Sequence, residues 1–188
     1  MIVYVDNNAT TKIADEVFEA MKPFLTENYG NPSSMHTFGG KIKRFIEKAR
    51  ESVASLLGAE SPSEIIFTSC GTESDNTAIM STLRSFPNKK HIITTKVEHP
   101  AVLSLCKYLE TVGYRVSYLN VDSKGQLDLD ELVYSIQSDT ALISIMYANN
   151  ETGVIFPIQE IAEIARQKNI IFHTDDVQAL GKIPFDLK

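Results

Sequence analysis

The sequence predicts an α/β fold in which helices flank a mostly parallel sheet. Two observations support this prediction. Short apolar runs, often rich in β-branched residues, recur along the chain, and segments in which apolar residues follow helical spacing lie between them. Such alternation is typical of strands joined by helices that pack on the faces of a parallel sheet. The part of the chain before residue 41 is less regular.

The N-terminal 40 residues are expected to form a helix and an arm. Residues 15–26 have the spacing of an amphipathic helix, and residues 29–40 are rich in turn-forming residues. We therefore divide the chain into an N-terminal helix with an arm or interface loop, residues 1–40, and an α/β domain, residues 41–188. The arm is expected to lie across the domain or a partner.

The remaining helices and the strands follow in turn. Residues 41–57 place seven apolar side chains on one face before Gly58, and residues 101–112 and 157–168 repeat the pattern. A further helix is expected to run through Asn76 and Leu83. The expected strands are residues 2–5, 64–68, 91–95, 115–119, 141–146 and 170–174.

Composition excludes several classes of protein. The 188 residues are 43% hydrophobic and 22% charged, which is enough to bury a core, and the net charge of -6 argues against a nucleic-acid or anionic-membrane binder. No apolar run is long enough to span a bilayer. Asp6 interrupts the first apolar run, so no signal peptide is expected, and two cysteines cannot form a disulfide framework. We expect a cytoplasmic, reduced protein.

Polar segments follow four of the expected strands, and these are residues 69–74, 98–99, 149–153 and 175–178. In open parallel sheets, ligands bind outside the carboxyl ends of the strands. The four segments are therefore expected to converge on one edge and to form a binding site there.

Residues 69–72 link a strand to the start of a helix. A glycine-containing turn at a helix N-terminus offers free N–H groups, a favourable dipole and hydroxyls, which together suit a phosphate. The alternative is a simple N-cap in which Ser69 or Thr72 satisfies the first turn. No GxGxxG or Walker pattern accompanies the segment.

Asp175 ends an expected strand, where a carboxylate could hold a protonated heteroaromatic nitrogen and make a cofactor a better electron sink. The alternative is a helix or turn cap. Gln178 is close enough to address the same ligand. His99 precedes Pro100 at the mouth of a helix, where it could stack on a planar ligand, shuttle a proton or simply cap a loop.

Other candidate groups favour structural roles. The four histidines are scattered without metal-ligand spacing, so no metal site is predicted. Cys106 shares a helical face with apolar residues and is expected to be an inert core thiol. Cys70 lies at a helix N-terminus, which should lower its pKa, although packing at the turn is its expected role. The basic residues between positions 41 and 50 are expected to form a solvated helix face.

Six motifs taken together resemble the cysteine desulfurases of the nitrogenase-associated type. These are pyridoxal-phosphate (PLP) enzymes of the class V aminotransferase group, with PLP fold type I. The motifs are residues 6–11, 30–36, 67–74, 97–102, 148–153 and 173–179. The similarity covers essentially the whole chain in register, so the fold is expected to be the large domain of this group, incomplete at the C-terminus.

The resemblance implies a role for each site residue. Gly71 and Thr72 would hold the cofactor phosphate, Asp175 the pyridinium nitrogen and Gln178 the phenolic oxygen of the ring. Three further residues would complete the site, with Asn150 beside ring and substrate, His99 stacked over the ring as a proton carrier, and Val177 on the other face.

The implied reaction converts L-cysteine to L-alanine and passes the sulfur on as a persulfide for iron–sulfur cluster assembly. A sulfur-acceptor or iron–sulfur scaffold protein is the implied partner. A homodimer or a complementing C-terminal chain is expected. Another class V enzyme, such as a selenocysteine lyase, and a non-catalytic PLP-binding or partner-binding remnant are the alternatives.

Two departures from the family pattern stand out. The family's Schiff-base lysine lies roughly 25 residues beyond the aspartate, in a Ser-x-His-Lys segment. Lys182 and Lys188 fall too early, and neither cysteine matches the persulfide-forming one. We expect this chain alone to be inactive, to bind PLP weakly and without a covalent link, and to be a truncation, a split-gene half or a remnant.

The second departure is Asp176, where the family usually has a small residue. Strand alternation turns its side chain away from the ring if Asp175 faces it. An unpaired carboxylate beneath the sheet would be costly, so Asp176→Ala is expected to be neutral or stabilising.

Overall fold

A computed structural model describes residues 2–184. The chain forms two compact units, one of residues 2–67 with Pro184 and the other of Thr68–Ile183. The functional division after residue 40 stays a prediction. None of the helices in the described part of the chain combines the length and the apolar content that crossing a bilayer requires.

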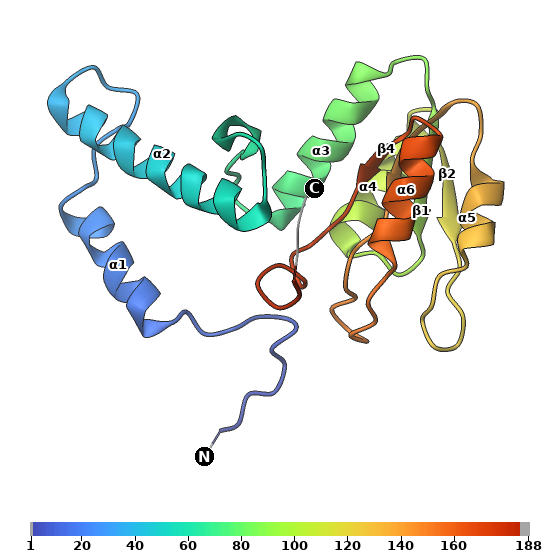
Figure 1. The fold of residues 1–188 in the computed structure, drawn as a ribbon, viewed down its shortest axis with the longest axis horizontal. Helices are drawn as coiled ribbons and strands as arrows, with labels where there is room; N and C mark the ends of the chain where they lie inside the picture. Colours follow the sequence, from blue (N-terminus) through green and yellow to red (C-terminus); the bar gives the residue numbers. More distant parts are fainter. Residues whose placement is uncertain (1, 185–188) are drawn as a thin grey trace. The chain divides into compact units, whose positions relative to one another are not determined.

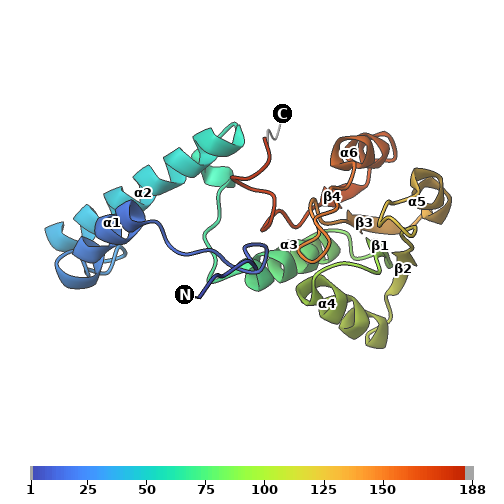
Figure 2. The ribbon, with the colours of Figure 1, turned by 90° about the horizontal axis from the view of Figure 1, so that it is seen from below.

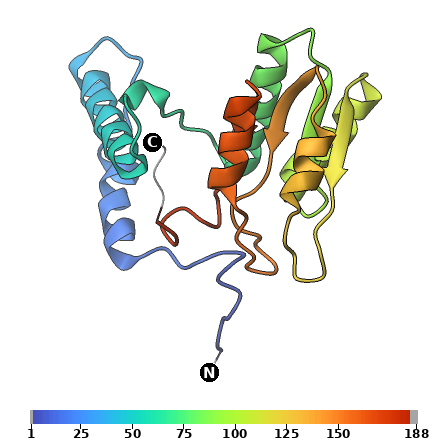
Figure 3. The same ribbon diagram turned by 45° about the vertical axis from the view of Figure 1, so that its right-hand side comes forward.

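The second unit contains the predicted parallel sheet (Figures 1 and 3). Its strands are β1 (His91–Thr95), β2 (Arg115–Leu119), β3 (Thr140–Ser144) and β4 (Ile171–His173), in the order β2-β1-β3-β4 and all parallel. Every residue of the central strands β1 and β3 is buried. Continuous apolar runs without alternation are expected of strands that are covered on both faces.

Helices cover both faces of this sheet (Figure 2). Those on one face are α3 (Gly71–Ser85) and α4 (Pro100–Thr111), and those on the other are α5 (Leu129–Ser135) and α6 (Ile158–Gln167). The face predicted for α4 is buried, including Cys106, which is fully inaccessible. The prediction of an α/β fold is therefore confirmed.

The first unit consists of α1 (Asp15–Thr26), α2 (Thr37–Leu57) and a 3-10 turn, Pro62–Glu64. The bounds of α1 agree with the prediction. Helix α2 begins earlier than predicted because the His36 side chain accepts the N–H of Gly39 and caps the helix. The rings of Phe24 and Phe45, 5.1 Å apart and edge to face, join the two helices.

The apolar face of residues 41–57 is largely exposed among the described residues. Ile42 is buried, but Leu56 is 67% exposed and Phe45 is 38% exposed. The apolar spacing is real, yet the described part of the chain covers little of that face.

Two predicted strands are absent from the described residues. Residues 2–5 and 65–68 form no strand pairs, and a capping box between Ser61 and Glu64 turns the start of the second run into the 3-10 turn. β-branched residues favour strands only where a neighbouring strand takes their backbone hydrogen bonds. Helix α5 was not predicted, because two helical turns are shorter than the window over which apolar periodicity is recognised. Asp128 caps this helix by accepting the N–H groups of Asp130 and Glu131.

Candidate functional site

The carboxyl ends of β1, β3 and β4 lie at one edge of the sheet, because the strands are parallel and adjacent (Figure 3). Each of these strands is followed within one to four residues by one of the predicted polar segments. The N-terminus of α3 contacts the segment after β4, since a Cβ on Gly71 would come within 3.0 Å of a methyl group of Val177. Three of the four predicted strand ends therefore lie at this edge, and the N-terminus of α3 adjoins them in place of the fourth, while the binding site itself stays a prediction.

The first turn of α3 has no side-chain oxygen as a cap. Cys70 is the N-cap residue and makes no side-chain cap hydrogen bond. Ser69 instead binds the Glu73 carboxylate, through its N–H at 2.7 Å and its hydroxyl at 2.6 Å. The alternative of a simple cap by Ser69 or Thr72 is therefore wrong, and the N–H groups at this end remain suited to an anion.

The pKa of the Cys70 thiol indicates which charge this helix end favours. The nearby N–H of Glu73, the Ser69 hydroxyl and the N–H of Thr72 lower the pKa of Cys70, so the end of α3 stabilises negative charge. The thiol is exposed, which contradicts the expectation that it packs at the turn. Thr72 is exposed beside it, as a phosphate-binding hydroxyl must be.

Asp175 follows β4 and is 9% exposed. Its carbonyl oxygen accepts the N–H of Tyr147 at 3.0 Å, and its Oδ1 accepts the N–H of Val177 at 3.0 Å. The turn-cap interpretation is therefore correct for one carboxylate oxygen, while Oδ2 accepts no hydrogen bond from the described residues. Burial raises the pKa of Asp175, and the hydrogen bond from the N–H of Val177 only partly offsets this effect.

His99 follows β1, and Gln178 lies three residues after Asp175. The His99 side chain is exposed and caps α4, with Nδ1 accepting the N–H of Ala101 at 3.2 Å. In the neutral ring the proton is therefore on Nε2. The Oε1 of Gln178 accepts a hydrogen bond from the Lys182 ammonium at 2.6 Å. The amide N–H groups of Gln178 can therefore donate to a ligand.

Two neighbouring asparagines in the loop after β3, Asn149 and Asn150, differ in their hydrogen bonds. Asn149 is buried, its Oδ1 accepts the N–H groups of Glu151 and Thr152, and its amide donates to the carbonyl of Val97 at 3.0 Å. It therefore builds the loop. Asn150, the predicted site residue, is half-buried and its side chain makes no hydrogen bond within the described chain, so it is the amide left for a ligand.

Glu98 is a buried carboxyl group to which sequence reasoning gave no role. Its oxygens accept the N–H of Met146 at 3.0 and 3.2 Å, and Oε1 also accepts the Thr95 hydroxyl at 2.9 Å. Burial raises the pKa of Glu98 to about 8, so the group is mostly protonated at neutral pH. Its place directly after β1 was visible in the sequence, but its burial was not.

Asp176 has a partner that was not predicted. Thr174 donates its hydroxyl to Oδ1 at 3.1 Å, so the carboxylate is not unpaired. Burial still raises the pKa of Asp176 to about 6, and the hydrogen bond only partly offsets this effect. Of the two lysines considered above, Lys182 is exposed and Lys188 lies outside the described residues.

Comparisons with known proteins agree with this geometry. The chain matches the family described as aminotransferase class-V over residues 3–188. It is 61% identical to a cysteine desulfurase of Nostoc sp. over 187 residues, covering 100% of this chain and 46% of that protein. It is 59% identical to the cysteine desulfurase NifS of Azotobacter vinelandii, covering 99% of this chain and 46% of that protein.

A solved structure is similar over the whole chain. A NifS-like protein superposes with a TM-score of 0.95 and 49% identity, covering 100% of this chain and 52% of that one. The chain spans about half the length of the relatives it matches. The resemblance inferred from six motifs is thus confirmed, and the chain belongs to the class V aminotransferase family.

Proposed function

We propose that this site binds pyridoxal 5′-phosphate and that the chain contributes it to a cysteine desulfurase. The observation that carries the proposal is Asp175, a buried carboxylate with one unused oxygen, in the segment that contacts the start of α3 through Val177 and Gly71. A ligand that has a phosphate at one end and a basic ring nitrogen at the other matches these two features.

The residues present fit the cofactor. Gly71 and Thr72 would bind the phosphate, because no side-chain oxygen caps the first turn of α3. The N–H groups of this turn also lower the pKa of Cys70, so they favour a negative charge there. Asp175 would hold the ring nitrogen as a pyridinium, and the Gln178 amide would donate to the phenolic oxygen. Val177 is 60% exposed and would cover one ring face.

Bound PLP would supply an electron sink for the substrate carbon. His99 would stack on the ring and carry protons on Nε2, since Nδ1 is used by the N–H of Ala101. Asn150 would contact ring and substrate with its unused amide. The substrate would be L-cysteine, the product L-alanine, and the sulfur atom would move to a thiol as a persulfide for iron–sulfur assembly. A cytoplasmic location, a dimer or a complementing chain, and a sulfur-acceptor partner belong to the same proposal.

Titration of PLP tests the site directly, followed by ring absorbance or calorimetry. Asp175→Ala should weaken binding by about 10- to 150-fold, because it removes a charge-assisted hydrogen bond of about 1.5–3 kcal/mol. Asp176→Ala is the matched control, because it removes the adjacent carboxylate and should leave the affinity unchanged. Equal affinities for the wild type and Asp175→Ala would remove Asp175 from the site.

A further inference from the structure

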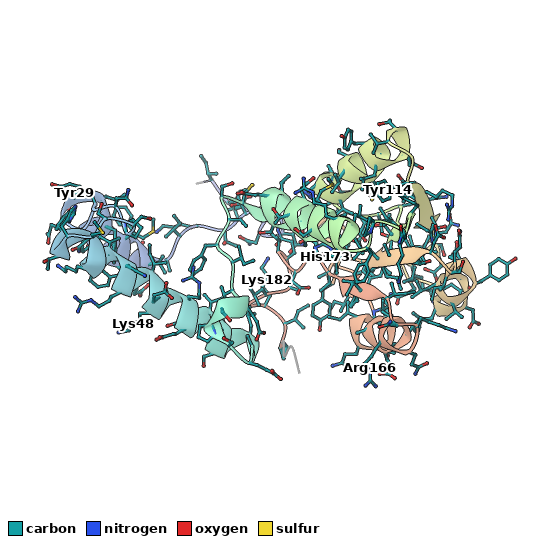
Figure 4. All side chains as sticks on the ribbon, turned by 90° about the horizontal axis from the view of Figure 1, so that it is seen from above. Tyr29, Lys48, Tyr114, Arg166, His173 and Lys182 are labelled. Carbon is teal, nitrogen blue, oxygen red and sulfur yellow. The ribbon has the colours of Figure 1, made fainter. Side chains whose placement is uncertain are left out.

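Three polar side chains, one each from α3, β3 and β4, contact one another in the interior, outside the residues assigned to the cofactor. Ser144 Oγ is 2.9 Å from His173 Nδ1, and His173 Nε2 is 3.5 Å from Asp75 Oδ1. Figure 4 shows His173 beside α3. The donor in the Ser144–His173 hydrogen bond depends on the imidazole tautomer, and the 3.5 Å contact places the Asp75 carboxylate beside Nε2 on the other side of the ring.

The trio has the composition of a hydrolytic triad, but its burial excludes that role. Ser144 is 1% exposed and the Asp75 side chain is 7% exposed. A substrate cannot reach a hydroxyl that lies inside the sheet, and a nucleophile must be within reach of its substrate. The chain of contacts is therefore structural or positional.

Its place in the fold connects the two ends of the proposed site. Asp75 is one helical turn beyond Gly71, where α3 begins, and His173 is the last residue of β4, two residues before Asp175. The Asp75–His173 contact thus joins the helix whose N-terminus receives the phosphate to the strand whose end receives the ring nitrogen.

We propose that Asp75 and His173 are positioning residues that fix the distance between the phosphate-binding end of α3 and Asp175. The proposal rests on the function proposed above. A ligand held at both ends gains affinity from the second contact only if the two half-sites already have the right spacing. Ser144 holds the imidazole in the orientation that reaches Asp75.

Electrostatics point the same way. Burial is the main cause of the raised pKa of Asp175, but Asp75 raises this pKa further and His173 lowers it, so both lie close enough to act on the ring-binding carboxylate. The Asp75 carboxylate and the His173 imidazole shift the pKa of Asp175 in opposite directions. Breaking the contact would therefore disturb both the spacing and the charge at Asp175.

The test compares a two-ended ligand with its halves in the whole protein. Pyridoxine 5′-phosphate carries ring and phosphate, while pyridoxine and inorganic phosphate each carry one. None has an aldehyde, so none reacts with lysines. The variants are Asp75→Ala and His173→Asn. The asparagine side chain places its amide near the position of imidazole Nδ1, but it is shorter than histidine and does not reach Asp75. His91→Asn is the matched control, a buried strand histidine bound to Thr140 and Ser117 at 2.8 and 2.9 Å.

We expect both variants to bind pyridoxine 5′-phosphate about tenfold more weakly or worse, and to bind pyridoxine and phosphate with wild-type affinity. The double variant should lose no more than either single one, and His91→Asn should bind all three ligands normally. Equal loss for the two-ended ligand and its halves, or no loss at all, would overturn the positioning role. A wild-type protein that binds no pyridoxine 5′-phosphate, or an Asp175→Ala variant that binds it normally, would instead overturn the proposed function.

Discussion

Asp176→Asn should stabilise the protein at neutral pH. In the folded chain, burial raises the pKa of Asp176 from 3.8 to about 6, despite the hydrogen bond from Thr174. This difference is about two pKa units, or about 3 kcal/mol between the two protonation states. The side chain is only half-buried, so screening by solvent reduces the expected gain to about 1–2 kcal/mol.

The sign of the pH dependence follows from linkage. The folded state holds this proton more tightly than the unfolded state, so the contribution of the protonated carboxyl is fully present below pH 3.8 and is lost as the pH rises through about 6. The asparagine variant does not titrate. The stability difference between variant and wild type should therefore grow from near zero at about pH 4 to its full value above about pH 7.

Urea unfolding at several pH values, followed by circular dichroism, measures this difference. The amide of the Asp176→Asn variant keeps an oxygen that can accept the Thr174 hydroxyl, and Thr174→Val removes that donor separately. A stability gain that is the same at acidic and neutral pH would refute the linkage reasoning. So would a variant that is less stable than the wild type at about pH 7.5, because the carboxylate would then have a stronger partner than Thr174.

Three further outcomes are expected. The wild type should lose stability as the pH rises from about 4.5 to about 8, and Glu98→Gln should reduce this loss, as measured by the same unfolding experiment. If the stability of the variant falls with pH as steeply as that of the wild type, the raised pKa of Glu98 is contradicted. In the native protein a thiol reagent such as iodoacetamide should label Cys70, which is exposed and has a lowered pKa, but not Cys106, whose pKa burial raises to about 12. Mass spectrometry of the labelled peptides identifies the site, and modification of Cys106 before unfolding would count against the buried core. A polypeptide of these 188 residues with added PLP should release no alanine from L-cysteine above the rate of free PLP, because neither Lys182 nor either cysteine matches the family's catalytic groups. Amino-acid analysis of the reaction checks this, and activity that exceeds free PLP would refute it.

Local patterns were sufficient for the elements that make their own hydrogen bonds or are covered on both faces. The 3.6-residue spacing predicted α1 with its observed bounds, and the continuous apolar runs predicted β1 and β3. The runs at residues 2–5 and 65–68 have similar composition but form no strands in the described chain. Whether a β-branched run becomes a strand depends on a neighbour that pairs with it, and the run itself does not contain that information.

The sequence by itself determined that polar residues come together at one edge of the sheet, because parallel strands place their carboxyl ends together and His99, Asn150 and Asp175 each come after such an end. Only the tertiary structure decided how these groups are used. It tied the Asn149 amide to the carbonyl of Val97 and left the Asn150 amide without a hydrogen bond in the described chain. It also buried Asp176 enough to raise its pKa and joined Asp75 to His173 across 98 positions of sequence. Burial and contacts between distant residues set hydrogen-bond partners and pKa values, and neither can be read from a residue's neighbours in the chain.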